Sequence, residues 1–226
     1  MIEELLPDSV VAVEMLGDEA IHEAPLYPEE AAQIARAVPK RRREFAAVRA
    51  CARRAMEKLG VPPQPVVRGE RGAPRWPDGL IGSMTHCEGY CAAALVRATD
   101  LASLGIDAEP HAALPEGVAE SVLLPSERQR LALLAAELPA VHWDRLLFSA
   151  KESVYKAWFP LTGQWLDFME ADIELVPEPG ERPHGILRAH LLVPGPEVGG
   201  RRLEVFEGRW SVGHSMLTSA VVVPHS

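Results

Sequence analysis

The chain has 226 residues, of which 47% are hydrophobic and 24% are charged, and its formal net charge at pH 7 is −9. This composition can bury the core of one large domain or two smaller ones, which excludes an intrinsically disordered chain, and its acidity argues against nucleic acid or an anionic membrane as a partner. Three cysteines are too few for a disulfide framework, and there is neither a basic leader nor an apolar run of about 20 residues, so we expect a cytoplasmic protein.

The N-terminal part of the chain predicts a strand, a broken helix and a long loop. The apolar stretch VVAVEML at 10–16 predicts a strand. Residues 29–59 carry apolar side chains at steps of three and four, which predicts helix, and Pro39 predicts a break within it. The Pro- and Gly-rich residues 61–79 predict loop with short strands.

Two apolar stretches follow this loop. The stretch GSMTHCEGYCAAALV at 82–96 begins with a turn signal and ends as a strand, and LASLGIDAEP at 101–110 predicts another strand. Residues 111–125 lack a periodic pattern, so we expect an irregular segment there.

The C-terminal part predicts two helices and then a series of strands. The first helix, at 124–138, would be capped by Ser126 after Pro125, and the second, at 142–163, ends near its Pro and Gly. Short strands separated by Pro and Gly turns are predicted at 172–176, 185–193, 202–208, 209–213 and 215–223. Strands and helices do not alternate regularly, which favours an α+β fold over a doubly wound sheet.

Two carboxylates mark the end of the strand at 101–110. Side chains alternate faces along a strand, so Asp107 and Glu109 point the same way and Ala108 points the other way. Like charges on one face repel each other, and either water at a solvated strand end or a metal ion would offset that repulsion. Mg²⁺ is commonly held by one or two carboxylates together with phosphate oxygens and water.

A third carboxylate lies in the second C-terminal helix, within FSAKESVYKAW. Glu152 and Lys156 are one helical turn apart, which is also the spacing of an ordinary surface ion pair. Lys151, Glu152 and Lys156 nevertheless lie among aromatic residues, where charges are costly unless they are paired or used. The alternative to a surface pair is a third metal ligand with two cations for phosphate groups.

His86 lies in SMTHCEGY close to Ser83 and Thr85, and is either a hydrogen-bonded strand-end histidine or a phosphate contact. A zinc site that combines it with Cys87 and Cys91 is disfavoured, because no fourth ligand follows at a suitable spacing.

Basic residues cluster at the start of the second N-terminal helix. The run Lys40–Arg43, with Arg49 beyond it, is either a solvated charge run or an anion-binding surface, and Arg68 would join the latter. Arginine suits phosphate because its planar fork of donors matches the phosphate oxygens. The chain has no P-loop, no GxGxxG, no GxSxG and no HExxH motif, so the common enzyme classes that use them have no support.

The two acidic motifs together resemble the signature of the Sfp-type 4′-phosphopantetheinyl transferases. That signature is (V/I)G(I/V)D(I/V/A)E followed further along by (F/W)(S/C/T)xKE(A/S)xxK, and this chain has LGIDAE at 104–109 and FSAKESVYK at 148–156. The resemblance covers nearly the whole chain. Stretches similar to the actinobacterial, PptT-like branch of the family lie at 40–60, 72–95, 142–162 and 208–212.

This resemblance implies an enzyme that transfers 4′-phosphopantetheine from coenzyme A to a serine of an apo acyl or peptidyl carrier protein and releases adenosine 3′,5′-bisphosphate. It implies Mg²⁺, or Mn²⁺, as the metal and coenzyme A as co-substrate. Glu152 would take the serine proton, directly or through water. The implied residues are Asp107, Glu109 and Glu152 for the metal; Glu152, Lys156 and Asp107 for catalysis; and Arg41, Arg49, Arg68, Ser83, Thr85, His86, Lys151 and Lys156 for coenzyme A.

The family fold implies two similar α+β halves related by a pseudo-twofold axis, here 1–103 and 104–226, with the active site in the cleft between them and a monomeric chain. The leucines of 111–125, Leu123 among them, either contact the carrier or close the core. Two rival functions stay open: another Mg²⁺-dependent phosphoryl or nucleotidyl transferase, and a module that binds coenzyme A or a carrier without transfer.

Overall fold

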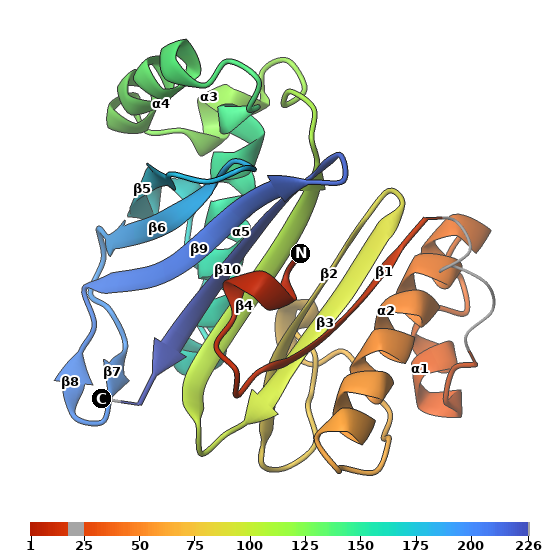
Figure 1. Cartoon of the computed structure of the whole chain (residues 1–226). Coiled ribbons are helices and arrows are strands. Elements are labelled where there is room, and N and C mark those ends of the chain that lie inside the picture. The colour runs from red at the N-terminus through yellow and green to blue at the C-terminus, as the bar shows by residue number, and fades with distance from the viewer. Residues whose placement is uncertain (18–24, 226) are drawn as a thin grey trace.

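The computed structural model describes residues 1–17 and 25–225 and shows two antiparallel sheets side by side, each covered by one long helix (Figure 1). The helices are α1 (Pro28–Gln33), α2 (Pro39–Lys58), α3 (Val118–Val122), α4 (Pro125–Glu137) and α5 (Trp143–Thr162), with short 3₁₀ turns η1 (Glu3–Leu5), η3 (Glu70–Gly72) and η4 (Phe168–Glu170). Within the described ranges, no helix has the length and apolar character needed to cross a membrane.

The strands form a three-stranded sheet in the order β1-β3-β2, a five-stranded sheet in the order β4-β10-β9-β6-β5, and a small β7-β8 pair. Their bounds are β1 (Val11–Leu16), β2 (Leu80–Cys87), β3 (Tyr90–Arg97), β4 (Leu101–Pro110), β5 (Ala171–Glu178), β6 (His184–Leu191), β7 (Glu197–Val198), β8 (Arg201–Arg202), β9 (Val205–Gly213) and β10 (Met216–Pro224). The predicted α+β class is confirmed.

Three details of the predicted elements were wrong. Gly82 lies inside β2 and not in a turn, because β3 passes so close that a Cβ there would lie 2.7 Å from the Ala94 carbonyl oxygen. Gly208 lies inside β9 for the same reason, against the Ala220 carbonyl of β10, so two predicted strands are one. Ser126 does not cap α4; Leu124 is the N-cap residue, and the Ser126 hydroxyl bonds the Asp172 carboxylate instead.

The two sheets meet along β2 and β4, which lie side by side without a backbone ladder. Two buried hydroxyls of β2 replace the ladder: Ser83 Oγ accepts from the Ile106 N–H at 3.0 Å, and Thr85 Oγ1 accepts from the Ala108 N–H at 3.2 Å. Because buried backbone donors are costly when unpaired, these two side chains hold the sheets at one register.

The two parts of the chain repeat one strand order, since β1-β3-β2 and β4-β10-β9 are each antiparallel and follow the same order of connection. A buried glutamate is repeated as well. Glu30 at the third position of α1 and Glu127 at the third position of α4 each accept the N-cap N–H, of Tyr27 and Leu124 respectively. This supports two similar halves; the axis relating them stays a prediction.

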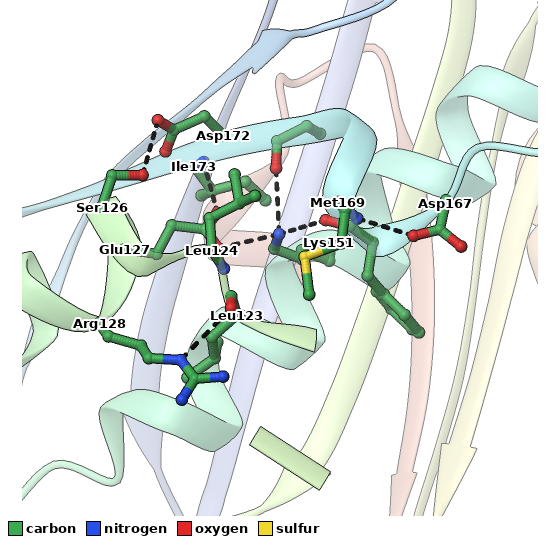
Figure 2. A network of polar contacts seen from close by, with 12 residues as sticks. Leu123, Leu124, Ser126, Glu127, Arg128, Lys151, Asp167, Met169, Asp172 and Ile173 are labelled. Carbon is green, nitrogen blue, oxygen red and sulfur yellow. Dashed lines mark hydrogen bonds and ion pairs between the residues drawn. The ribbon is translucent and has the colours of Figure 1, made fainter. Parts of the chain in front are cut away.

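Each buried glutamate also binds a distant segment and a cation of the next long helix. Glu30 accepts from the Val66 N–H at 2.8 Å and pairs with Arg53 of α2 at 3.1 Å. Glu127 accepts from the Ile173 N–H at 2.8 Å and pairs with Lys151 of α5 at 2.9 Å (Figure 2). Each long helix is thereby tied to the short helix before it.

Gly105 allows α5 to lie directly against β4. A Cβ at this position would be far inside van der Waals contact of the Ser153 carbonyl oxygen and 2.7 Å from the Ala157 nitrogen, both backbone atoms of α5. The close approach matters because β4 carries Asp107 and α5 carries Glu152 and Lys156.

We predict that Gly105→Ala lowers the free energy of unfolding by about 1–3 kcal/mol, because backbone cannot yield as a side chain can. Urea denaturation would measure it. Gly213→Ala is the matched control: its new methyl would meet only the exposed Arg182 guanidinium, at 3.3 Å, so the expected change is within about 0.5 kcal/mol. Equal changes in the two variants would contradict the close packing of α5 on β4.

Candidate active site

A cavity of about 540 Å³ lies where α2, the 68–76 loop and β2 meet β4 and α5. Its wall therefore takes residues from both parts of the chain. Of the residues that the sequence predicts for the site, those that line the cavity are Arg41, Arg49, Arg68, Ser83, His86, Glu152 and Lys156. Thr85, Asp107, Glu109 and Lys151 lie outside its lining.

Asp107 is the most firmly held of the three carboxylates predicted to bind the metal. It is 4% exposed, and its Oδ1 accepts from Lys156 Nζ at 2.7 Å and from Thr85 Oγ1 at 3.0 Å. Its Oδ2 is buried without a hydrogen-bond partner, and the only other such side-chain atom in the described ranges is Arg145 Nε. Buried polar atoms normally have partners, so an unpaired carboxylate oxygen here indicates a place for a ligand.

Glu109 is held from one side only. Its Oε2 accepts from Arg145 Nη1 at 2.8 Å, and the two side chains are both mostly buried. Burial raises the pKa of Glu109, the charge of Asp107 raises it further, and the Arg145 guanidinium opposes that shift. The other carboxylate oxygen of Glu109 makes no hydrogen bond within residues 1–17 and 25–225.

Glu152 has no hydrogen-bonded partner in the part of the chain that the structure describes, although it is half-buried at the cavity wall. Burial raises its pKa, Lys156 opposes this shift, and Asp107 and Glu109 add to it. A carboxyl with a raised pKa is a better proton acceptor at neutral pH than an ordinary glutamate.

These three carboxylates suit a divalent cation by their chemistry. Asp107, Glu109 and Glu152 each have an oxygen without a hydrogen-bond partner among residues 1–17 and 25–225, and oxygen ligands are what Mg²⁺ prefers. Among the described residues, no three His, Cys, Asp or Glu side chains are close enough together to hold one ion as they stand. A cation held by all three carboxylates would therefore require these side chains to move closer together.

The opposite wall of the cavity is basic. Arg41 Nη1 contacts His86 Nε2, and Glu44 lies 3.5 Å from both side chains. Burial lowers the pKa of His86, and the positive charge of Arg41 lowers it further. The Arg68 guanidinium lies over the Phe45 ring, 4.8 Å from its centroid. Arg41, Arg68 and His86 thus place three nitrogen-bearing side chains on one wall of the cavity.

Arg49 lies in the same wall but is almost fully buried. It is 4% exposed, donates to the carbonyl oxygens of Val66 at 2.8 Å and Phe45 at 3.3 Å, and lies 3.9 Å from Glu30. Burial lowers the pKa of the guanidinium, and Glu30 opposes that shift. Arg49 therefore holds the cavity wall together and adds positive charge to it.

Lys151 does not line the main cavity, but it does line a smaller cavity of about 90 Å³ next to Glu152. Its ammonium, on a side chain that is 2% exposed, pairs with Glu127 at 2.9 Å and donates to the carbonyl oxygens of Ala171 at 3.0 Å and of Phe168 (Figure 2). These partners use all three of its N–H donors, so none is left for a phosphate. The geometry therefore does not support a contact between Lys151 and the phosphates of coenzyme A.

Ser83, which lines the main cavity, and Thr85 also have a structural role. Both hydroxyls serve the junction between β2 and β4, and Thr85 in addition donates to Asp107. Leu123, a candidate for contact with a carrier, is 5% exposed and packs in the core beside α5. For this residue the alternative of closing the core holds.

The structure adds residues that the sequence did not single out. Arg145 contacts Glu109, and Tyr155 lines the main cavity together with Phe45. One signal was available for Arg145, because it lies two helical turns before Glu152 on the same face of the predicted helix. The aromatic residues carried no such signal, since aromatic side chains on a helix usually pack in the core.

Comparisons with known proteins find the same family along the chain. The 4'-phosphopantetheinyl transferase N-terminal domain matches residues 29–96, and the 4'-phosphopantetheinyl transferase superfamily matches residues 103–192. The chain is 57% identical to 4'-phosphopantetheinyl transferase Svp of Streptomyces mobaraensis over 99% of its length and 89% of the relative. It is 48% identical to 4'-phosphopantetheinyl transferase Npt of Nocardia iowensis, over 98% of this chain and 99% of the relative. It is also 48% identical to 4'-phosphopantetheinyl transferase PptT of Mycobacterium tuberculosis, over 87% of this chain and 85% of the relative.

Because Lys151 has a structural role, we predict that replacing it lowers the free energy of unfolding strongly. Lys151→Met leaves the Glu127 carboxylate buried without its cation, and removing one partner of a buried pair costs about 3–5 kcal/mol. Urea denaturation would measure this loss. Arg130→Met removes the cation of the more exposed Arg130–Asp172 pair nearby, so it should cost less than about 1 kcal/mol. A Lys151 variant as stable as the Arg130 variant would show that the buried pair does not anchor α5.

Proposed function

We propose that this chain, which belongs to the 4'-phosphopantetheinyl transferase superfamily and is an enzyme of that type, moves the 4'-phosphopantetheine group of coenzyme A to a serine hydroxyl of an apo acyl or peptidyl carrier protein, with release of adenosine 3',5'-bisphosphate. One observation carries the assignment of the site: a buried carboxylate oxygen without a partner, on Asp107, lies next to a cavity whose far wall is basic. An acidic group for a cation and a basic wall for phosphates are the two requirements of transfer from a pyrophosphate.

Coenzyme A would lie across the main cavity with its phosphates toward Arg41, Arg68 and His86. Lys156 lines the same cavity and would donate to the phosphoryl group that is transferred. A smaller cavity of about 90 Å³ shares Glu152 and Tyr155 with the main one and is also lined by Trp165 and Phe168. Its aromatic wall suits the pantetheine arm, which would leave the pyrophosphate beside Glu152.

A divalent cation, Mg²⁺ or Mn²⁺, would be held by Asp107, Glu109 and Glu152. When bound, it would neutralise charge on the pyrophosphate oxygens. Lys156 orients Asp107 through the 2.7 Å contact between its Nζ and Oδ1. Glu152 is the group that we assign to the serine proton, directly or through water, because its pKa is raised and no donor among the described residues bonds it.

We further propose that the halves 1–103 and 104–226 each supply one side of a site completed within a single chain. Arg41, Arg68 and His86 come from the first half, and Asp107, Glu109, Glu152 and Lys156 come from the second. We therefore expect a monomer to be active, with the carrier protein as its macromolecular partner.

The function is tested by intact-mass spectrometry of an apo carrier protein incubated with this protein, coenzyme A and Mg²⁺. We expect a gain of one phosphopantetheine that is lost on adding EDTA, in Asp107→Ala and in a carrier whose serine is alanine. No gain with several carriers, while coenzyme A still raises the melting temperature, would instead indicate a binding module. Better protection from unfolding by ATP than by coenzyme A would indicate a different phosphoryl or nucleotidyl transferase.

We predict that His86 takes up a proton when coenzyme A binds. In the free protein its pKa is lowered, so the imidazole is neutral near neutral pH and can accept the Arg41 contact. A phosphate group beside it favours the imidazolium, so binding should take up as much as about one proton, and affinity should fall as pH rises. Calorimetry in two buffers of different ionisation enthalpy would measure the uptake, with His86→Gln as the control that lacks it. Equal uptake in both proteins would remove His86 from the phosphate site.

A further inference from the structure

Arg145 lies in the first turn of α5 and binds the chain on both sides of the end of β4. Its Nη1 donates to Glu109 Oε2 at 2.8 Å, and its Nη2 donates to the Ala113 carbonyl oxygen at 2.9 Å. The neighbouring Asp144 accepts from the Leu114 N–H at 3.0 Å. The start of α5 thereby fixes both the Glu109 carboxylate and the backbone that follows β4.

We propose that Arg145 is a positioning residue for the transfer reaction: it holds one oxygen of Glu109 and directs the other oxygen toward the divalent cation. This inference rests on the proposed function, because it assigns Glu109 to the cation. Arg145 itself touches neither substrate nor the reacting atoms.

The shape of the contact supports this role. The guanidinium is a rigid planar fork, so one nitrogen can be fixed to the Ala113 carbonyl while the next bonds Glu109. A lysine at this position would place one point charge and could slide between the two carboxylate oxygens. The arginine therefore limits the rotation of the Glu109 carboxylate, which a merely neutralising cation would not do.

The distribution of unpaired atoms supports a functional role as well. Among the described residues, two buried side-chain nitrogen or oxygen atoms lack hydrogen-bond partners, Asp107 Oδ2 and Arg145 Nε. Asp107 and Glu109 share one face of β4, so both unpaired atoms belong to the acidic end of this strand. An arginine placed only to support a loop would be expected to have its buried donors satisfied.

Arg128 provides a matched comparison. Its Nε donates to the Leu123 carbonyl oxygen at 3.4 Å (Figure 2). Its Nη2 donates to the Ala119 carbonyl oxygen at 3.3 Å, so Arg128 also fixes backbone between β4 and α4. It forms no ion pair with a carboxylate within residues 1–17 and 25–225. A variant of Arg128 therefore reports the effect of losing an arginine that only supports this segment.

The test measures Mn²⁺ binding by electron paramagnetic resonance in the full-length protein without coenzyme A or carrier. We expect Arg145→Gln to weaken Mn²⁺ binding by about tenfold, as is typical when a residue that orients a metal ligand is lost, and Arg128→Gln to leave it unchanged. The Mg²⁺ concentration for half-maximal transfer should rise by a similar factor in Arg145→Gln, while kcat at saturating Mg²⁺ stays within about threefold of wild type.

Arg145→Lys keeps the positive charge but lacks the planar guanidinium. This variant tests the proposal if Arg145→Gln does not fold. Weaker Mn²⁺ binding in this variant supports positioning, whereas unchanged binding overturns it. Unchanged Mn²⁺ affinity in Arg145→Gln would likewise overturn the proposal, and tighter binding would show that Arg145 competes with the cation. The proposed function fails separately, if wild type transfers nothing or if Asp107→Ala binds Mn²⁺ as well as wild type.

Discussion

The Asp107 carboxylate is the interaction on which the site depends, because both parts of the chain meet at it. Thr85 reaches it from β2, Lys156 reaches it from α5, and its own strand β4 lies between them. These two donors share Oδ1 and leave Oδ2 buried and unpaired. The arrangement requires the hydroxyl-bridged contact of β2 with β4 and the close approach of α5 at Gly105. The geometry of the Asp107 carboxylate therefore depends directly on how the two sheets pack together.

The repeated buried glutamates explain why two neighbouring lysines of α5 have different roles. Lys151 continues a pattern seen at Arg53 of α2, in which a basic side chain of the long helix pairs with a glutamate of the short helix before it. Lys156 faces β4 and has no counterpart in that pattern. A motif that contains both lysines thus combines one residue that holds the fold together with one that serves the site. The first must be buried and fully bonded, and the second must keep access to the cavity.

The sequence predicted the elements and the acidic site because these follow from local pattern. Alternation along β4 places Asp107 and Glu109 on one face, and helical spacing places Glu152 near Lys156. It could not give the direction of Lys151, because a rotation of about 100° per residue is enough to turn a side chain from the cavity to the core. Gly82 and Gly208 were read as turn signals, yet each permits a neighbouring strand to approach. Arg145 was missed because its partner, Glu109, is distant in the sequence.

The three carboxylates differ in how the chain holds them, and this difference separates their roles. Asp107 has a lysine and a hydroxyl, Glu109 has an arginine, and Glu152 has no hydrogen-bonded partner in the described ranges. Three carboxylates near one another repel, and the two internal cations offset this repulsion before any divalent ion binds. Glu152 lacks a hydrogen-bonded cation among the described residues, although the charge of Lys156 lowers its pKa, and it is the one of the three that lines the main cavity. Asp107 and Glu109 are therefore suited to hold a cation, and Glu152 is suited both to hold it and to accept a proton.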